Sequence, residues 1–231
     1  MLAALKERCG GALRAVALEG STAKGLAAPR SDLEFRVILS GRVDRWHTLF
    51  MDGMFVGLSV STWAQTLRDA RTVDYEWPLK GDRFTACRVL HDPEGLYARL
   101  RGAAVRAEAR ADFTALVREA LADMYEHVLK LMCLGDGALS LTAEAREVAF
   151  WAAIAAALAN RHLYASSRRM FEDALTLPGM PAVFAPALQA LLSSGDAAPA
   201  VRAAAGRLWP AMREWGEGLG LTWEDPALQS V

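Results

Sequence analysis

Two short motifs near the start of the chain have residue types suited to phosphate chemistry. The first is Gly20-Ser21, which follows an apolar run, and the second is Asp32-Leu33-Glu34, which opens another. On a β-strand, residues two positions apart point to the same face, so Asp32 and Glu34 would lie together, opposite Leu33. Two neighbouring carboxylates repel each other unless a cation lies between them, and such hard oxygen ligands suit Mg²⁺. The pattern therefore predicts a metal site where this second strand begins.

The glycine-serine motif has the properties of a phosphate-binding turn. Gly20 lets the backbone approach a ligand closely, and we expect Ser21 to begin a short helix whose free N–H groups point at phosphate oxygens. Lys24 follows one turn later and is either a further phosphate ligand or an ordinary solvated lysine. Combined with the two carboxylates, these residues indicate phosphoryl or nucleotidyl transfer. The alternative is a solvated strand end with two ordinary carboxylates.

The spacing of the two motifs resembles the signature of the DNA polymerase β-like nucleotidyltransferase superfamily. More narrowly, the chain resembles the kanamycin (aminoglycoside) nucleotidyltransferase family. The segments that carry this resemblance are Gly20-Ser21, Ser31-Asp32-Leu33-Glu34, Glu76-Trp77-Pro78-Leu79, Leu90-His91-Asp92-Pro93-Glu94-Gly95, Arg161-His162-Leu163-Tyr164-Ala165-Ser166-Ser167 and Glu214-Trp215. The resemblance implies an enzyme that moves an NMP, AMP in the first instance, from Mg-NTP to a hydroxyl of an aminoglycoside-like small molecule and releases pyrophosphate.

The resemblance also implies a role for individual residues. Asp32 and Glu34 would hold Mg²⁺ ions that bridge the phosphates of ATP or another NTP, while Gly20-Ser21 and Lys24 would bind those phosphates. The family carries a Glu-x-x-x-Lys pair on a helix, and Glu126 with Lys130 matches that spacing. The glutamate would act as the general base, and the lysine would steady the phosphate charge.

The helix predicted over residues 113–131 leaves a choice of base. One face of this helix is apolar, and another carries Glu119, Asp123, Glu126 and Lys130. Aligning the family pattern on Glu119 would make Asp123 the base, whereas the accompanying lysine favours Glu126. The simpler alternative is a solvated acidic face with one i,i+4 ion pair. A line of carboxylates would also attract a polycationic substrate.

One departure from the family pattern concerns a third carboxylate. The superfamily places it on a neighbouring strand, and our alignment puts Gly57 at that position. The strand predicted there contains no Asp or Glu, although Asp52 precedes it. The protein would then use one metal, recruit Asp52 or Glu76, or be a catalytically silent nucleotide-binding protein with an antitoxin-like or regulatory role.

The elements that must position these residues divide the chain into two parts. In residues 1–100, short strands alternate with helices, which predicts a nucleotidyltransferase α/β domain. The strands are expected at 14–19, 33–40, 55–61 and 87–90, and the helices at 1–9 and 63–70, with 42–50 either a helical insertion or a loop. In residues 101–231, helical patterns cover 104–133, 142–167 and 198–216, the last interrupted or kinked at Pro210. We therefore predict an α+β protein: a polymerase β-like mixed sheet with helices, followed by an all-α helical bundle.

Composition limits the partners that we expect. The formal net charge is −1, which gives no footprint for nucleic acid and disfavours a polymerase or tRNA-modifying role. The longest apolar run, 148–159, is too short to cross a bilayer, and the first residues lack a signal-peptide core, so we expect no membrane association and a cytoplasmic location. The three cysteines, Cys9, Cys87 and Cys133, have no zinc-site spacing, and the last two are expected in the core. By resemblance, the partners are a nucleotide, a small hydroxyl-bearing acceptor and a second copy in a homodimer. Polycationic molecules are among the candidate acceptors.

Overall fold

The computed structural model describes residues 1–41, 45–193 and 198–223, and the chain forms two compact units. The first unit joins Met1–Val73 to Leu79–Ala111, and the second joins Asp74–Pro78 to Asp112–Val231. The division expected after residue 100 lies inside helix α5 (Leu96–Arg110), which belongs to the first unit. The predicted α+β class is confirmed, because a mixed sheet with helices comes first and the elements described after it are helices.

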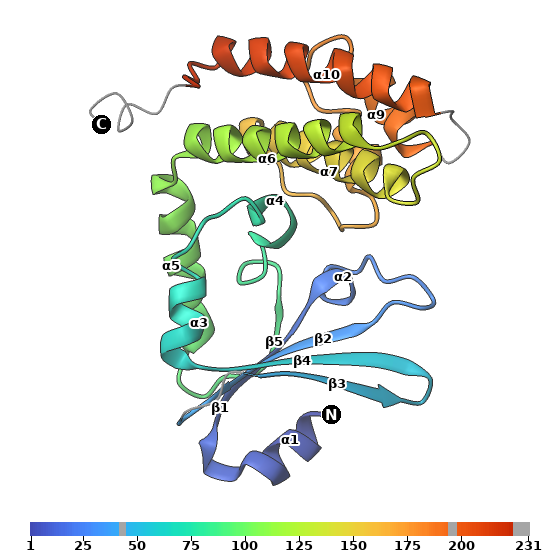
Figure 1. The fold of residues 1–231 in the computed structure, drawn as a ribbon. Coiled ribbons are helices and arrows are strands. Elements are labelled where there is room, and N and C mark those ends of the chain that lie inside the picture. The colour runs from blue at the N-terminus through green and yellow to red at the C-terminus, as the bar shows by residue number, and fades with distance from the viewer. Residues whose placement is uncertain (42–44, 194–197, 224–231) are drawn as a thin grey trace. The chain divides into compact units, whose positions relative to one another are not determined.

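The first unit is built on a five-stranded sheet with the order β3-β4-β2-β1-β5 (Figure 1). Its strands are β1 (Leu13–Glu19), β2 (Leu33–Leu39), β3 (Arg45–Met51), β4 (Met54–Thr62) and β5 (Arg88–His91). Strands β2 and β4 are parallel, and the other neighbouring strands are antiparallel. Four of these strands correspond to the predicted ones. Helix α3 (Trp63–Asp69) also starts as predicted, at a capping box formed by Thr62 and Gln65.

Strand β3 corrects the interpretation of residues 42–50 as a helical insertion or a loop. From Arg45 onward this segment is a strand, while 42–44 lie outside the described residues. Met51 pairs with Met54, which leaves Asp52-Gly53 as a two-residue turn with φ angles of 50° and 76°. Positive φ at both positions is the backbone of a type I′ hairpin turn, for which Asp-Gly is a favoured sequence. The Asp-Gly pair is therefore the local signal for this hairpin.

One face of the sheet packs against the first helix of the chain. Side chains alternate between the two faces of a strand, so every second residue of each strand can join this layer. Helix α1 (Leu2–Cys9) contributes Leu5 to an apolar cluster in which strand residues such as Val16, Phe35 and Val60 are buried. This face is therefore closed by an apolar layer.

The other face of the sheet packs against α3 and α5. Ala17 and Ile38 are buried there in a cluster with residues of α5, and side chains of α3 lie against the same cluster. Glu19 stands two positions from Ala17, and Glu34 stands four positions from Ile38, so both share this face. The sheet thus presents these two carboxylates beside the α3 and α5 cluster.

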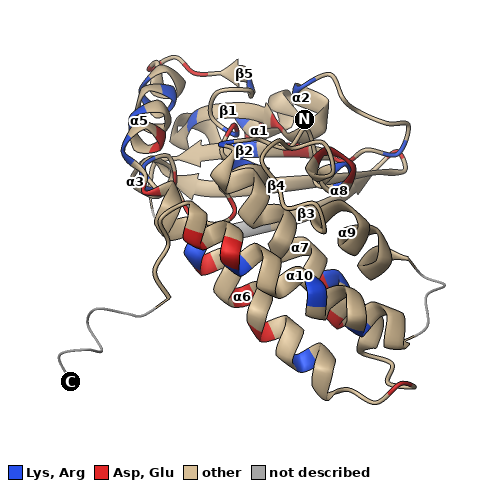
Figure 2. Cartoon of the chain, turned by 90° about the horizontal axis from the view of Figure 1, so that it is seen from above, with Lys and Arg blue, Asp and Glu red and all other residues tan. Residues whose placement is uncertain are grey.

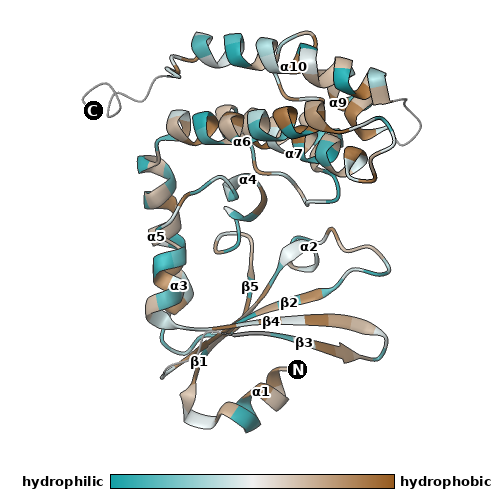
Figure 3. Cartoon of the chain, viewed as in Figure 1, coloured by the Kyte–Doolittle hydropathy of each residue, from teal (hydrophilic) through white to brown (hydrophobic). Residues whose placement is uncertain are grey.

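The second unit consists of helices, as the sequence predicts. They are α6 (Phe113–Cys133), α7 (Leu141–Ala159), α8 (Met170–Ala174), α9 (Phe184–Leu192) and α10 (Ala198–Gly218). Helix α6 packs along α7, and α10 packs against α9 and α6. Helix α7 is strongly apolar (Figure 3), and its residues 152–158 are all buried. No helix that the structure describes is both long enough and apolar enough to cross a membrane.

The helix bounds differ from the predicted ones at two places. The pattern over 104–133 is divided between α5 and α6, because the Asp112 side chain accepts a hydrogen bond from the Ala115 N–H and caps a new helix. The pattern over 142–167 ends at Ala159, and Arg161 beyond it has a positive φ of 47°. Helix α10, in contrast, continues through Pro210.

The short segment 74–78 is held by aromatic and backbone contacts within the second unit. The ring of Tyr75 lies 5.1 Å from that of Trp151, and the ring of Trp77 lies 4.9 Å from that of Phe113. The Tyr164 N–H donates a hydrogen bond of 2.8 Å to the Pro78 carbonyl. These contacts explain why a segment between two parts of the first unit belongs to the second.

Candidate functional site

The first unit contains a cavity of about 260 Å³. Its charged side chains come from the sheet, from the end of α2 (Gly20–Ala23), from the last residue of α4 (Trp77–Lys80) and from the segment after α4. Its cationic residues are Lys24, Arg36, Lys80 and Arg83, and its acidic residues are Glu19, Glu34 and Asp82. Side chains of both signs therefore line the cavity, with one more cation than carboxylates. Of the predicted site residues, the structure brings Gly20, Lys24 and Glu34 together here.

Gly20 lies against a carboxylate of the cavity wall. Its φ is +68°, and a Cβ atom at this position would overlap Oε2 of Glu34. The backbone conformation therefore favours glycine, and a larger residue would also displace the Glu34 carboxylate. In the structure the close neighbour of Gly20 is the Glu34 side chain, and the approach of a ligand to this glycine stays a prediction.

Helix α2 (Gly20–Ala23) begins one residue earlier than predicted, with Glu19 rather than Ser21 ahead of its first turn. Ser21 and Asp32 are not among the residues that line the cavity. Asp32 is exposed just before β2, and its main-chain carbonyl accepts a hydrogen bond of 3.1 Å from Oγ1 of Thr22. This bond ties α2 to the start of β2, so the two motifs are held side by side.

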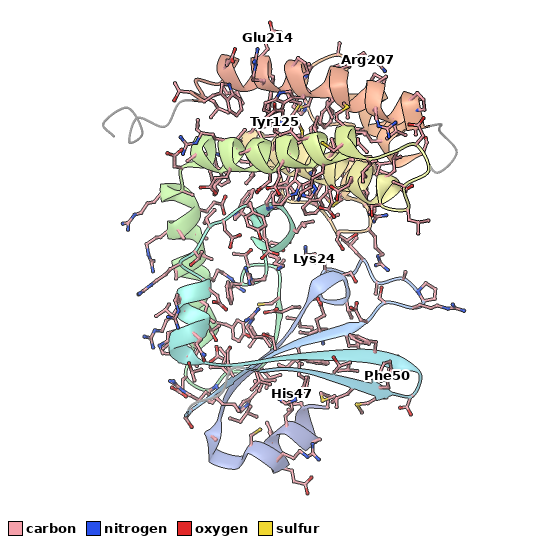
Figure 4. All side chains as sticks on the ribbon, viewed as in Figure 1. Lys24, His47, Phe50, Tyr125, Arg207 and Glu214 are labelled. Atoms are coloured by element: carbon pink, nitrogen blue, oxygen red, sulfur yellow. The ribbon has the colours of Figure 1, made fainter. Side chains whose placement is uncertain are left out.

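Lys24 follows α2 (Figure 4) and forms an ion pair instead of extending into solvent. Its Nζ lies 2.5 Å from Oδ2 of Asp82, and the two side chains are only 17% and 19% exposed. Asp82 comes from the segment between α4 and β5, and sequence reasoning missed it. The pair joins two parts of the cavity wall.

A buried ion pair between Glu19 and Arg36 is the other main electrostatic feature. Nε of Arg36 donates to Oε1 of Glu19 at 2.6 Å, and Nη2 donates to Oε2 at 3.2 Å. Burial alone would lower the pKa of Arg36, but the Glu19 carboxylate outweighs this and the pKa lies above its ordinary value. The guanidinium also lies 5.3 Å from the centre of the Phe84 ring. Sequence reasoning missed this pair, although an arginine within the apolar strand 35–39 marks an unusual position.

Glu34 lies between two carboxylates. It pairs with Glu19 across β1 and β2 and with Gly57 across β2 and β4. Burial raises the pKa of Glu34, and the charges of Asp32 and Glu19 raise it further, whereas Arg36 and Lys80 oppose the shift. A nearby cation would stabilise the ionised form of this carboxylate.

The side chains present fit one Mg²⁺ ion better than two. Mg²⁺ is commonly held by one or two carboxylates together with water and substrate phosphates, and Asp32 with Glu34 could supply those carboxylates. Within the part of the chain that the structure describes, no group of three or more His, Cys, Asp or Glu side chains could hold a metal ion. Neither Asp52, at the tip of the β3–β4 hairpin, nor Glu76 lines the cavity. Gly57, where our alignment expects the third carboxylate, pairs with Glu34 across β2 and β4, and this alignment stays a prediction.

Glu126 and Lys130 form the predicted pair on α6, which belongs to the second unit. Their Oε1 and Nζ atoms lie 2.7 Å apart, and both side chains are largely exposed. The hydrogen bond from Lys130 lowers the pKa of Glu126, and the same bond raises the pKa of Lys130. On the same helix, Nδ1 of His127 lies 2.8 Å from Oε2 of Glu144 on α7. The choice between Glu126 and Asp123 as the base stays a prediction.

Two cysteines differ from the expectation that they are core residues. Cys87 is half-buried and lines the charged cavity, where burial raises the pKa of its thiol. Cys133, the last residue of α6, is exposed. The apolar neighbours of both cysteines in the sequence predicted burial. Cys87 instead precedes the edge strand β5, and Cys133 ends α6.

Comparison with solved structures identifies the fold as that of a nucleotidyltransferase-like protein. The chain is similar to the crystal structure of a nucleotidyltransferase-like protein from Exiguobacterium sibiricum 255-15, with a TM-score of 0.54 and 9% identity. The match covers 94% of this chain and 73% of that chain. The chain belongs to the KNTase C-terminal domain family, whose model matches residues 94–222. Comparison with curated proteins gives no match. The predicted resemblance to kanamycin nucleotidyltransferase is thereby confirmed.

Proposed function

We propose that this protein is a nucleotidyltransferase that moves an NMP, in the first instance AMP, from Mg-NTP to a hydroxyl of an aminoglycoside-like small molecule. The observation that carries the proposal is the charged cavity beside Glu34, in a chain of the KNTase C-terminal domain family. Cationic side chains in the cavity suit a triphosphate, and the neighbouring carboxylates suit the cation that accompanies it.

In this proposal, the residues of the first unit bind and orient the nucleotide. Asp32 and Glu34 would hold one Mg²⁺ ion, which supplies charge neutralisation at the phosphates when bound. Lys24 and Lys80 would neutralise further phosphate charge, Lys24 by exchanging part of its contact with Asp82 for the ligand. Gly20 keeps the backbone clear of the Glu34 carboxylate, so that this carboxylate can stay in place.

We assign Glu126 as the general base that accepts the proton of the acceptor hydroxyl. The carboxylate of Glu126 is exposed, and the hydrogen bond from Lys130 favours its ionised form by lowering its pKa. An ionised carboxylate can accept that proton, and the lowered pKa makes it a weaker base. The hydroxyl oxygen then forms a bond to the α-phosphorus, the bond to the leaving oxygen breaks, and pyrophosphate departs with that electron pair. We expect a homodimer, as the family resemblance implies.

The direct test is pyrophosphate release from Mg-ATP over a panel of aminoglycosides. Release that requires one acceptor and is lost in Asp32→Asn would support the proposal. The substitution keeps the size of the side chain and removes only its charge. If Asp32→Asn left a detected activity unchanged, the assigned metal site would be wrong.

A second candidate function is a catalytically silent nucleotide-binding protein. Two observations favour it: Glu34 faces Gly57 across the sheet, and the neighbouring Glu19 is engaged by Arg36. Calorimetry with ATP, with and without Mg²⁺, separates the two functions when combined with the release assay. Tight ATP binding without pyrophosphate release over the whole panel would favour the silent protein, and clear release would exclude it.

A further inference from the structure

A second cavity, of about 290 Å³, lies between α3 and α5 in the first unit. Its walls include Trp63, Leu67 and Arg71 on one side and Arg99, Gly102 and Arg106 on the other. Within each set the residues are three or four positions apart, so each set forms one stripe of its helix or of the turn that follows it. We call this cavity the arginine groove. It shares no lining residue with the charged cavity beside Glu34.

The arginines of the groove form no ion pair within the described part of the chain. None of the ion pairs found over residues 1–41, 45–193 and 198–223 includes Arg71, Arg99 or Arg106. The described residues that line the groove include no Asp or Glu, and Glu108, which follows Arg106 on α5, does not reach its wall. Figure 2 shows the Lys and Arg residues along α5 in blue. Three like charges around one cavity repel each other, and a bound anion would relieve this repulsion.

Two acidic residues near these helices are engaged elsewhere. Asp69 of α3 lies 3.7 Å from Arg36, and Glu94, ahead of α5, pairs with Arg14. The charge of Arg99 also lowers the pKa of Glu94, but less than Arg14 does. The carboxylates of Asp69 and Glu94 therefore pair with Arg36 and Arg14 and do not neutralise the arginines of the groove by direct ion pairs.

Two contacts place the guanidinium groups. The guanidinium carbon of Arg99 lies 4.6 Å from the centre of the Trp63 ring, which is a cation–π arrangement. A Cβ atom at Gly102 would lie 3.2 Å from Nη1 of Arg106, so the glycine leaves room for that guanidinium against the helix. Planar guanidinium groups held in this way offer paired N–H donors, which match the oxygens of a phosphate.

We propose that the arginine groove binds a small anion with two or more phosphate groups. Its volume lies just below the usual range for ligand pockets, which suits a short phosphate chain. Phosphate groups match both the number of charges and the forked donors. This site is separate from the nucleotide site proposed above and does not depend on it.

The test is calorimetric titration of the full chain with inorganic tripolyphosphate, without Mg²⁺. The variant Arg99→Gln/Arg106→Gln should bind about tenfold more weakly or worse, because each charge-assisted hydrogen bond contributes strongly. The matched control is Arg8→Gln/Arg207→Gln, which removes two exposed positive charges from α1 and α10 and should bind as the parent does. Circular dichroism checks that each variant is folded.

A second variant keeps the test decisive if the α5 variant fails to fold. Arg71→Gln removes a charge from the other wall of the groove, at an exposed position after α3, and should also weaken binding. Lys80→Gln, in the other cavity, should leave groove binding in place. The proposal would be overturned if the parent, Arg99→Gln/Arg106→Gln and Arg71→Gln all bound tripolyphosphate with equal affinity. It would also be overturned if only Lys80→Gln lost tripolyphosphate binding. Tripolyphosphate binding no tighter than sulfate binding at matched ionic strength would overturn it too.

Discussion

Replacing Gly20 with alanine should disturb both the fold of the first unit and its candidate metal site. The backbone at this position has a φ of +68°, and the added Cβ would overlap Oε2 of Glu34. Two separate costs are therefore expected. One is the backbone strain of an L-residue in the left-handed region, and the other is the displacement of the Glu34 carboxylate.

Each of these costs has an approximate size. An L-residue in the left-handed region costs about 1–2 kcal/mol. The carboxylate is at the end of a flexible side chain, so it can rotate away, and an off-rotamer side chain costs about 0.5–1.5 kcal/mol. We therefore expect Gly20→Ala to lower the free energy of unfolding by about 1.5–3.5 kcal/mol, the sum of these two ranges. The displaced carboxylate should also weaken Mg-ATP binding.

Gly25 offers a matched control for this prediction. Its φ is +73°, close to that of Gly20, but a Cβ there would have no atom within 4 Å. Gly25→Ala should therefore show the backbone cost alone and leave Mg-ATP affinity unchanged. The difference between the two variants isolates the contact with Glu34.

Urea unfolding followed by circular dichroism, with calorimetry for Mg-ATP, would measure both effects. In a Glu34→Ala background, the substitution at position 20 should cost no more than the substitution at Gly25, because the overlapping atom is gone. Equal stability and equal Mg-ATP affinity in Gly20→Ala and Gly25→Ala would refute the reasoning.

Three further predictions concern charged groups. Glu19→Ala should lower the free energy of unfolding by about 3 kcal/mol or more in urea, because it leaves the buried guanidinium of Arg36 without its main partner; a change near zero would contradict this. Asp32→Asn, or removal of Mg²⁺ with EDTA, should abolish pyrophosphate release, and full activity in either case would exclude the metal site. Lys130→Met should raise the pKa of Glu126, so the acid limb of the pH–rate profile should move to higher pH; an unmoved limb would argue against Glu126 as the base.

The parts of the fold that could be predicted are those that depend on local pattern. Strands β1, β2 and β4 contain buried apolar runs, and the Glu126–Lys130 pair needs only the spacing of one helix. Strand β3 was not recognised because it is an edge strand with large apolar side chains in solvent, among them Phe50 at 79% exposure. Its alternation is therefore weak, and the Asp-Gly turn is the better signal.

The parts of the site that could not be predicted depend on contacts between distant segments. Glu19 meets Arg36 because β1 and β2 pair in one particular register, and no local pattern specifies that register. Lys24 meets Asp82 across 58 positions of the chain, through a segment without regular structure. Residue types alone thus pointed to Lys24 and Glu34 but not to Glu19, Arg36 and Asp82, which line the same cavity.

The assignment of segment 74–78 to the second unit affects how the protein forms during synthesis. The chain enters the second unit there and returns to the first at Leu79, so the units are joined at three points rather than one. A newly made chain has Trp77 in place before its partner Phe113 and well before Tyr164, which binds the carbonyl of Pro78. Chain synthesis proceeds at about 5–20 residues per second, so segment 74–78 remains for seconds without these partners. Because the chain passes between the units three times, a single crossover between relatives would exchange neither unit as a whole.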